Sequence, residues 1–249
     1  MMNMTPVVKQ LLIINIIFFL GSQLVPVSYE YLAMFFPENP NFKPWQPITH
    51  MFMHGGFMHI AFNMFAMVSF GSALEHFWGG KKFLFFYISC GLGSALLHTA
   101  VNYYSFQDVI STLTANGFQK QEILKLLAEG KIDTRWQNLV SVSEFSGFTD
   151  AYLGTVVGAS GAIYGLLTAF AFMFPNAELA LMFIPVPIKA KYFVPGILAI
   201  DLFLGFKGSS LFGSGGTGIA HFAHIGGALT GYLMMLYWKK NQFNKNRWN

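Results

Sequence analysis

Six stretches of mainly apolar residues constrain the fold of this chain more than any other feature. They cover residues 7–24, 57–73, 83–101, 152–174, 192–206 and 219–238. A bilayer core about 30 Å thick is crossed by about 20 helical residues, and a helix satisfies its own backbone hydrogen bonds there. Only 10% of the residues are charged, against about 25% in an ordinary soluble domain. The sequence therefore predicts an all-α integral membrane protein, with six spans in one domain over residues 1–249.

The polar segment 102–150 predicts a long insert outside the membrane, between the third and fourth spans. Within it Ile123, Leu126 and Leu127 recur at helical spacing, which predicts a short amphipathic helix ending near Gly130. We expect this helix to cover the neighbouring spans at the interface, and binding of a specific partner is the open alternative. Residues 26–47 are rich in proline and predict an irregular loop.

Basic residues in the short connections predict the orientation in the membrane. They fall in the turns near Lys81 and Lys189 and in the tail 239–249, all on one side of a six-span bundle. By the positive-inside rule both termini are cytoplasmic and the insert is extracytoplasmic. The net charge of +4 is explained by this pattern and predicts no nucleic-acid partner. The first run lacks the cleavage signature of a signal peptide, so we expect a retained helix.

Polar residues interrupt three of the apolar runs at matching depth. His59 and Asn63 lie in the second run, Ser160 in the fourth and His224 in the sixth. An ionisable residue inside a membrane predicts a functional site by default.

Small residues offer a way for these spans to approach each other closely. They form pairs four residues apart, which are typical of tight helix contacts in membranes: Gly154 with Gly158, Gly161 with Gly165, and Gly227 with Gly231. Any one such pair is explained equally well by plain helix packing. Together they predict that the fourth and sixth spans bring Ser160 within hydrogen-bonding reach of His224.

These motifs, taken in chain order, resemble the motif set of the rhomboid intramembrane serine proteases. The resemblance covers residues 7–238 and rests on His59-xxx-Asn63, Gly158-Ala159-Ser160-Gly161 and His224-xx-Gly227-xxx-Gly231. It implies a six-helix rhomboid-like bundle, and the insert is the main departure from a minimal core of that kind.

The resemblance also implies the roles of the site residues. Ser160 corresponds to the nucleophile and His224 to its base, in a dyad without a carboxylate. His59 and Asn63 correspond to the groups that stabilise the oxyanion, and Gly158 supports the site beside the serine. Tyr164 corresponds to the aromatic residue that packs on the catalytic histidine.

The chemistry of amide hydrolysis supports these roles independently. A serine becomes nucleophilic when a base accepts its proton, and that base is oriented by a third contact. No acid lies near His224 in the sequence, so stacking on Tyr164 is the natural orienting contact. Asp201, in the fifth span, is interpreted as a structural acid, with a third catalytic role as the alternative. The Ser160 backbone N–H would join His59 and Asn63 around the oxyanion.

The other histidines and the cysteine do not form a pattern that predicts a metal or cofactor site. His50 and His54 have the i, i+4 spacing of a metal pair, but no thiolate or carboxylate joins them and no His-Glu-x-x-His helix is present. His221 is interpreted as a non-catalytic neighbour of His224, and Cys90 as a small packing residue.

The sequence thus predicts an endopeptidase of a bacterial inner membrane, with single-pass transmembrane proteins and the lipid bilayer as partners. A proteolytically inactive rhomboid-like protein that binds membrane helices is the alternative. A transporter would be expected to show an internal repeat, and none is seen. The short, proline-containing fifth span and the Gly/Ser-rich connection 208–218 predict a lateral gate near Leu202, Phe203 and Phe206. We expect the two phenylalanines to pack against the second span. The substrate and the oligomeric state do not follow from the sequence.

Overall fold

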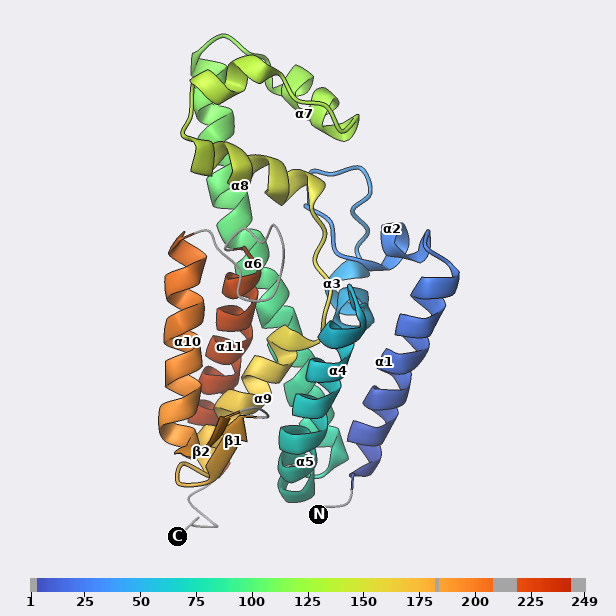
Figure 1. The fold of residues 1–249 in the computed structure, drawn as a ribbon, viewed down its shortest axis with the longest axis vertical. Helices are drawn as coiled ribbons and strands as arrows, with labels where there is room; N and C mark the ends of the chain where they lie inside the picture. The colour runs from blue at the N-terminus through green and yellow to red at the C-terminus, as the bar shows by residue number, and fades with distance from the viewer. Residues whose placement is uncertain (1–3, 182–183, 208–218, 243–249) are drawn as a thin grey trace.

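The computed structural model describes residues 4–181, 184–207 and 219–242, and most of them are helical (Figure 1). The long helices are α1 (Pro6–Leu24), α6 (Gly80–Ala115), α9 (Ser160–Met173), α10 (Ala190–Lys207) and α11 (Ile219–Gln242). A further long rod joins α4 (Phe57–Ala66), the π-helical turn η2 (Met67–Gly71) and α5 (Ser72–Trp78). The short elements are α2 (Ser28–Leu32), α3 (Gln46–Thr49), η1 (His50–Phe52), α7 (Lys120–Ala128), η3 (Thr134–Asn138), α8 (Val142–Leu153), β1 (Glu178–Leu181) and β2 (Ile184–Lys189).

Three of the described helices are long and apolar enough to cross a membrane: α1, the rod Phe57–Trp78, and α6. The chain is therefore a membrane protein with a mostly helical fold. The count of six spans stays a prediction. The second span was expected at 57–73, and it continues for another helical turn to Trp78.

The fourth predicted span, 152–174, is wrong in its first part. Helix α8 ends at Leu153, residues 154–159 are not helical, and α9 begins at Ser160. At about 1.5 Å per residue, the 14 residues of α9 reach about 21 Å, less than a bilayer core. The small residues of this stretch read as a continuous apolar helix, but Gly158 has φ 124°, which a right-handed helix excludes.

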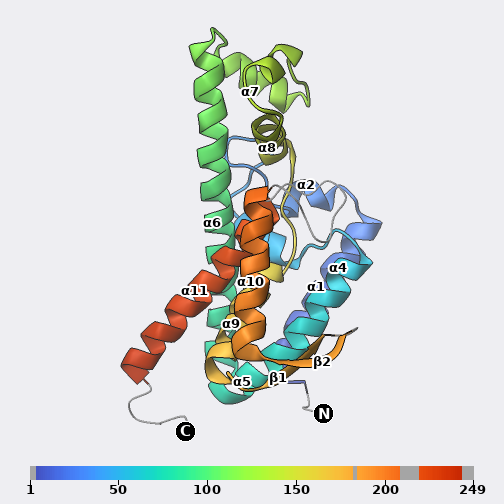
Figure 2. The same cartoon turned by 60° about the vertical axis from the view of Figure 1, so that its left-hand side comes forward.

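The predicted insert 102–150 also needs correction at its start. Helix α6 runs for 36 residues, past residue 101, and its second half carries the insert away from the bundle (Figure 2). The predicted amphipathic helix is confirmed as α7, but its apolar side does not cover the spans. Instead Ile123 and Leu127 enter a separate core with Phe106, Trp136 and Phe148.

The insert therefore packs as a small helical unit of its own. Ser141 and Glu144 form a reciprocal capping box at the start of α8, which satisfies two backbone donors that a helix end leaves free. Hydrogen bonds from Arg135 hold the pKa of the Asp133 carboxyl, in the insert, below its usual range. Glu38, from the proline-rich loop, accepts from Gln107 and pairs with Lys120, which joins the insert to that loop.

The all-α prediction is corrected by a β-hairpin, whose strands cover residues 178–181 and 184–189. Strands β1 and β2 pair antiparallel, with Glu178 opposite Lys189. Pro185 and Pro187 lie in β2, where proline disfavours helix but is tolerated in a two-stranded ribbon that has only edges. Apart from this hairpin, the regular elements of the described residues are helical.

Glycines set the spacing of the three central helices α6, α9 and α11. A Cβ on Gly227 would overlap the backbone of Gly161, and a Cβ on Gly231 would lie 2.9 Å from the Gly165 carbonyl oxygen. On the α6 side, a Cβ on Gly226 would lie 2.8 Å from the Gly93 carbonyl oxygen. The predicted close approach is therefore confirmed for the pairs in α9 and α11, and it is wrong for Gly154 and Gly158.

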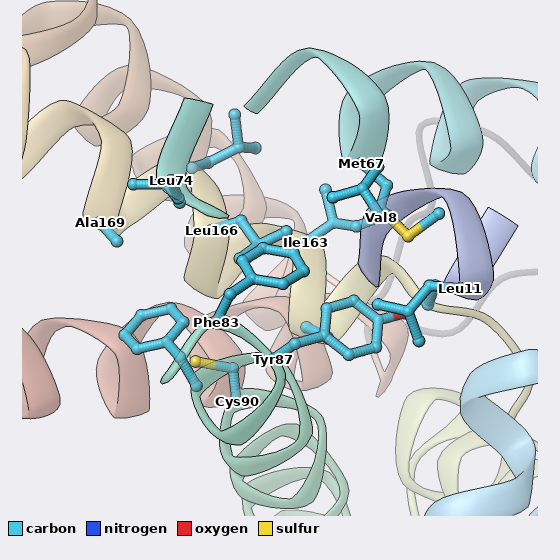
Figure 3. Close-up of a cluster of buried hydrophobic side chains, with 14 of the residues drawn as sticks. Val8, Leu11, Met67, Leu74, Phe83, Tyr87, Cys90, Ile163, Leu166 and Ala169 are labelled. Carbon is cyan, nitrogen blue, oxygen red and sulfur yellow. The ribbon is translucent and has the colours of Figure 1, made fainter. Parts of the chain in front are cut away.

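The main hydrophobic core lies where α1, η2, α5 and α9 pack against α6 (Figure 3). Its labelled side chains are Val8, Leu11, Met67, Leu74, Phe83, Tyr87, Cys90, Ile163, Leu166 and Ala169. Cys90 is buried with its thiol free, as expected of a packing residue. Glu75 accepts hydrogen bonds from the backbone N–H groups of Val7 and Val8 and from Thr5 Oγ1. It therefore caps α1, since a carboxylate suits a helix N-terminus.

The two ends of the bundle differ in character. The start of α1, the turn from α5 to α6, the β-hairpin and the end of α11 lie together at one end (Figure 1). Those segments include Lys81, Lys82, Lys189, Lys191 and Lys239. The insert extends from the opposite end.

Candidate active site at the start of helix α9

Ser160 and His224 meet between α9 and α11. The Ser160 Oγ lies 3.0 Å from His224 Nε2, although 64 residues separate them in the chain. Both are partly buried, and the His224 side chain is 20% exposed. The close glycine contacts described above hold the two helices near enough for this hydrogen bond.

Ser160 is the first residue of α9, and this position has chemical consequences. The first N–H groups of a helix have no intrahelical acceptor, and the helix dipole favours negative charge beside them. The sequence prediction missed this feature because it placed Ser160 inside a continuous span. The positive φ of Gly158 agrees with a glycine two residues before the serine, since glycine adopts positive φ readily.

The segment before Ser160 is fixed by backbone hydrogen bonds to the proline-rich loop and to η1. Met34 and Val156 exchange two N–H···O bonds of 3.0 and 2.9 Å, and the Gly158 N–H donates to the His50 carbonyl at 2.9 Å. Because three such bonds hold one short extended segment, the start of α9 is well defined.

His59 and Asn63 lie on α4 and face Gly158. A Cβ built on Gly158 would be 2.7 Å from His59 Nε2 and 3.8 Å from Asn63 Nδ2. Among the described residues Asn63 Nδ2 has no hydrogen-bond partner, although it is buried. His59 Nδ1 accepts a long hydrogen bond of 3.4 Å from the Gly55 N–H, which assigns the ring proton to Nε2. Two donors thus lie beside Gly158, two residues before Ser160.

Tyr164 lies one helical turn after Ser160 on the same face of α9. Its ring stacks on His224 with centroids 4.2 Å apart and planes 7° apart. The structure therefore brings together all six residues of the predicted site: Ser160, His224, His59, Asn63, Tyr164 and Gly158.

Asp201 is the neighbour that sequence spacing did not place. It is 3% exposed and lies on α10, with Oδ1 2.5 Å from His221 Nδ1 and 3.4 Å from His224 Nδ1. The signal available in the sequence was its isolation, as a carboxylate inside an apolar run. Its partner could not be predicted from the sequence, since Asp201 and His224 are 23 positions apart in the chain.

The candidate metal ligands are arranged differently from the pair considered in the sequence. The ligand atoms of Asp201, His221 and His224 all lie within 4.8 Å of one another. His50 Nδ1 is instead engaged with the Gln46 carbonyl at 2.9 Å. His54 is buried and its ring lies 5.0 Å from that of His59. His98 is buried within α6 and contacts Asn102.

This arrangement suits acyl transfer. It combines a hydroxyl within reach of an imidazole, an aromatic ring that stacks on the imidazole, and side-chain N–H donors next to Gly158. Such donors stabilise the oxyanion that forms when a hydroxyl adds to a carbonyl.

Comparison with known proteins gives one consistent family. The model of the Rhomboid domain matches residues 41–117 and 136–241, and residues 118–135, within the predicted insert, lie between the two matched segments. Presenilin-associated rhomboid-like protein A, mitochondrial, of Danio rerio is 26% identical over 226 residues, which cover 88% of this chain and 45% of the relative.

Two further relatives have similar identities. The human Presenilin-associated rhomboid-like protein, mitochondrial, is 25% identical over 229 residues, covering 88% of this chain and 46% of the relative. Rhomboid protease AarA of Providencia stuartii is 25% identical over 202 residues, covering 77% and 55%. The chain thus spans about half the length of the curated relatives it matches.

Proposed function

The chain belongs to the rhomboid family, and from this premise we propose that it is a serine endopeptidase that cleaves transmembrane segments of other membrane proteins. The observation that carries the proposal is the 3.0 Å contact between Ser160 Oγ and His224 Nε2. A relative of similar identity is named as a rhomboid protease, which agrees with this activity.

The first half of the reaction forms an acyl-enzyme. Ser160 Oγ attacks the carbonyl carbon of the scissile amide as its proton passes to His224 Nε2. The carbonyl oxygen becomes an oxyanion, and the Ser160 N–H, Asn63 Nδ2 and His59 Nε2 donate to it. The C–N bond then breaks, and His224 gives its proton to the departing amine.

The second half uses the same groups in reverse. A water molecule gives one proton to His224 Nε2 while its oxygen adds to the acyl carbon. The second oxyanion collapses and releases the carboxylic acid, and the proton on His224 returns to Ser160 Oγ. Ser160 and His224 are thereby restored, and one peptide bond has been hydrolysed with the consumption of one water molecule.

The position of the site predicts the substrate class. Ser160 lies between helices of the bundle, at the end of α9 nearer the insert (Figure 1). An intact helix hides its amides in its own hydrogen bonds, so a transmembrane substrate must unwind locally to present one. We expect single-pass proteins with small residues at the cut and glycine or proline nearby.

The orientation and the location are part of the proposal. The basic turns and the basic end of α11 lie at one end of the bundle, which by the positive-inside rule is the cytoplasmic end. Both termini would then be cytoplasmic, and the insert and Ser160 would lie toward the other side. We propose the inner membrane of a bacterium, while the relatives compared above include mitochondrial and bacterial proteins.

A fluorophosphonate probe tests this function directly. Such a probe labels only a serine that a neighbouring base activates, so the detergent-solubilised wild type should be labelled at Ser160 and should cleave a model transmembrane substrate. Ser160→Ala and His224→Ala should lose both activities while remaining folded. An unlabelled, inactive wild type would favour an inactive relative that binds membrane helices. Cleavage that persists in pure Ser160→Ala protein would disprove the mechanism.

A further inference from the structure

A buried carboxylate contacts both histidines of α11. Asp201, on α10, is 3% exposed, and its Oδ1 lies 2.5 Å from His221 Nδ1 and 3.4 Å from His224 Nδ1. His221 and His224 are three residues apart, so they share a face of α11. Helix α10 packs mainly on α11 and α9, which places this oxygen behind the imidazole whose other nitrogen faces Ser160.

The tautomer of His224 determines which ring nitrogen donates and which accepts in the contacts with Ser160 and Asp201. To accept the Ser160 proton, Nε2 must be unprotonated, and the ring proton must then reside on Nδ1. A partly buried N–H is stabilised by an acceptor, and Asp201 Oδ1 lies 3.4 Å from Nδ1. Stacking on Tyr164 fixes the plane of the ring but does not choose between the two tautomers.

We propose that Asp201 is the positioning residue of His224, so that the site works as an Asp201–His224–Ser160 series with His221 holding the carboxylate in place. This rests on the proposed protease function and extends it, because the motif set implies a dyad without a carboxylate. Asp201 acts through His224 and does not touch the substrate.

The carboxylate would contribute twice during the reaction. In the resting enzyme it selects the Nδ1–H tautomer, which leaves Nε2 free to accept. After proton transfer His224 is an imidazolium, and the negative charge beside it stabilises that state. The 3.4 Å contact is long for a hydrogen bond, and contacts of this kind tighten when the substrate binds.

A metal ion is the competing use of the same three side chains, since their ligand atoms lie within 4.8 Å of one another. A metal on His224 Nδ1 would require that nitrogen to be unprotonated, whereas the proposal requires a proton there. The two interpretations therefore make opposite predictions about whether His224 Nδ1 carries a proton.

The first experiment measures the protonation of His224 Nδ1 in the wild type, so it does not depend on the folding of a variant. Nitrogen-15 NMR of protein labelled at its seven histidines distinguishes the two tautomers, and His224→Ala identifies the signals of His224. We expect a protonated Nδ1 and an unprotonated Nε2 at neutral pH. The opposite tautomer, or a metal bound in stoichiometric amount whose chelation abolishes activity, would overturn the proposal.

The second experiment compares Asp201→Asn with Asp201→Glu and with Glu75→Gln. Asparagine keeps the shape of the side chain but can present an N–H to His224, and in a close triad the same change lowers kcat about 10⁴-fold. With the longer contact seen here we expect a fall in kcat and in phosphonate labelling of about 10²-fold, with KM changed less than about threefold. Asp201→Glu should restore part of the rate because it returns the charge.

Glu75→Gln is the matched control, since Glu75 is also buried and multiply hydrogen-bonded but caps α1 away from the site. It should lower Tm while leaving kcat within about twofold. If Ser160→Ala is inactive while folded Asp201→Asn retains the full wild-type rate, the positioning role is overturned and the protease function stands. If Ser160→Ala keeps the activity, the protease function itself fails.

Discussion

The ring of Tyr164 lies flat against the imidazole of His224, with centroids 4.2 Å and planes 7° apart. A stack of this kind restricts the tilt of the imidazole, while rotation within its own plane is left to hydrogen bonds at the two nitrogens. Those nitrogens contact Ser160 on one side and Asp201 on the other. The orientation of the base is thus defined by side chains from α9 and α10 as well as by its own helix.

Replacing Tyr164 tests the stack. We expect Tyr164→Ala to lower kcat roughly 10- to 100-fold, because the imidazole is then free to tilt away from Ser160. Tyr164→Phe keeps the ring and should retain most of the rate. The measurement is kcat on a transmembrane substrate, with folding checked by Tm. Equal losses in both variants would assign the effect to the hydroxyl group rather than to stacking.

Asn63 should matter more for turnover than for binding. Its Nδ2 is buried without a partner among the described residues, so it is available to an oxyanion that exists only in the transition state. Asn63→Ala should reduce kcat by about 10²-fold with little change in KM. Asn15→Ala is a control, because buried Asn15 donates to the Leu11 carbonyl on α1 and should affect stability alone. A large loss of binding with unchanged kcat would remove Asn63 from the oxyanion site.

Gly158→Ala should abolish activity for two separate reasons. Its φ of 124° is a backbone conformation that residues with a side chain rarely adopt, and the added Cβ would lie 2.7 Å from His59 Nε2. We expect a rate loss of more than about 10²-fold, because a donor of the oxyanion site is displaced. Gly147→Ala, in α8, has no atom within 4 Å of its added Cβ and should behave like wild type. Wild-type turnover in Gly158→Ala would show that this tight contact is unnecessary.

The sequence predicted those features that depend on the local order of residues. Apolar runs gave the positions of the long helices, and i, i+4 spacing placed Ser160 and Tyr164 on one face of α9. Small residues four apart predicted the contact of α9 with α11, because glycine permits close approach whatever the rest of the fold. The rhomboid resemblance is confirmed by the family match, while the catalytic roles stay predictions.

The features that sequence reasoning missed depend on contacts between distant segments. The start of α9 at Ser160 is fixed by backbone bonds from residues 154–159 to Met34 and His50, which no periodicity reveals. Asp201 reaches His224 only because α10 packs on α11. The course of α6 beyond residue 101 follows from the core around Phe106 and Trp136, whereas the polar composition suggested that the helix would end.

A pair of glycine variants tests the packing of the central helices. A Cβ on Gly227 would overlap the backbone of Gly161, whereas Gly196, on α10, has open space around its added Cβ. Gly227→Ala should destabilise the protein by about 1–3 kcal/mol or more, because helix backbones cannot yield as a flexible side chain can. Gly196→Ala should be neutral or stabilise by about 0.5–1 kcal/mol. Thermal unfolding in detergent measures both, and a neutral Gly227→Ala would contradict the described contact.

Access to Ser160 from the bilayer is predicted to involve α10. This helix contains Pro195 and packs mainly on α11 and α9. The sequence-based gate expected Phe203 to pack against the second span, but Phe203 is 62% exposed and Leu202 42% exposed. The connection 208–218, also assigned to the gate, lies outside the described residues. We expect Phe203→Ala to raise turnover of a transmembrane substrate if outward movement of α10 limits the rate.

Crosslinking α10 to α4 tests whether this helix must move. Phe203→Cys and Phe62→Cys, both at exposed positions, would be introduced together with Cys90→Ala, since Cys90 is the sole cysteine. Thiol crosslinkers of graded length, cleavable by reduction, would then join the two helices. A closed gate should lower cleavage of a transmembrane substrate at least about 10-fold, and reduction of the linker should restore it. Phosphonate labelling of Ser160 should continue throughout, because a small probe does not need lateral entry.

Each single-cysteine variant treated in the same way controls for modification alone. Full cleavage with the crosslink shown to be complete would exclude movement between α4 and α10 and would place the entry of the substrate on another face of the bundle.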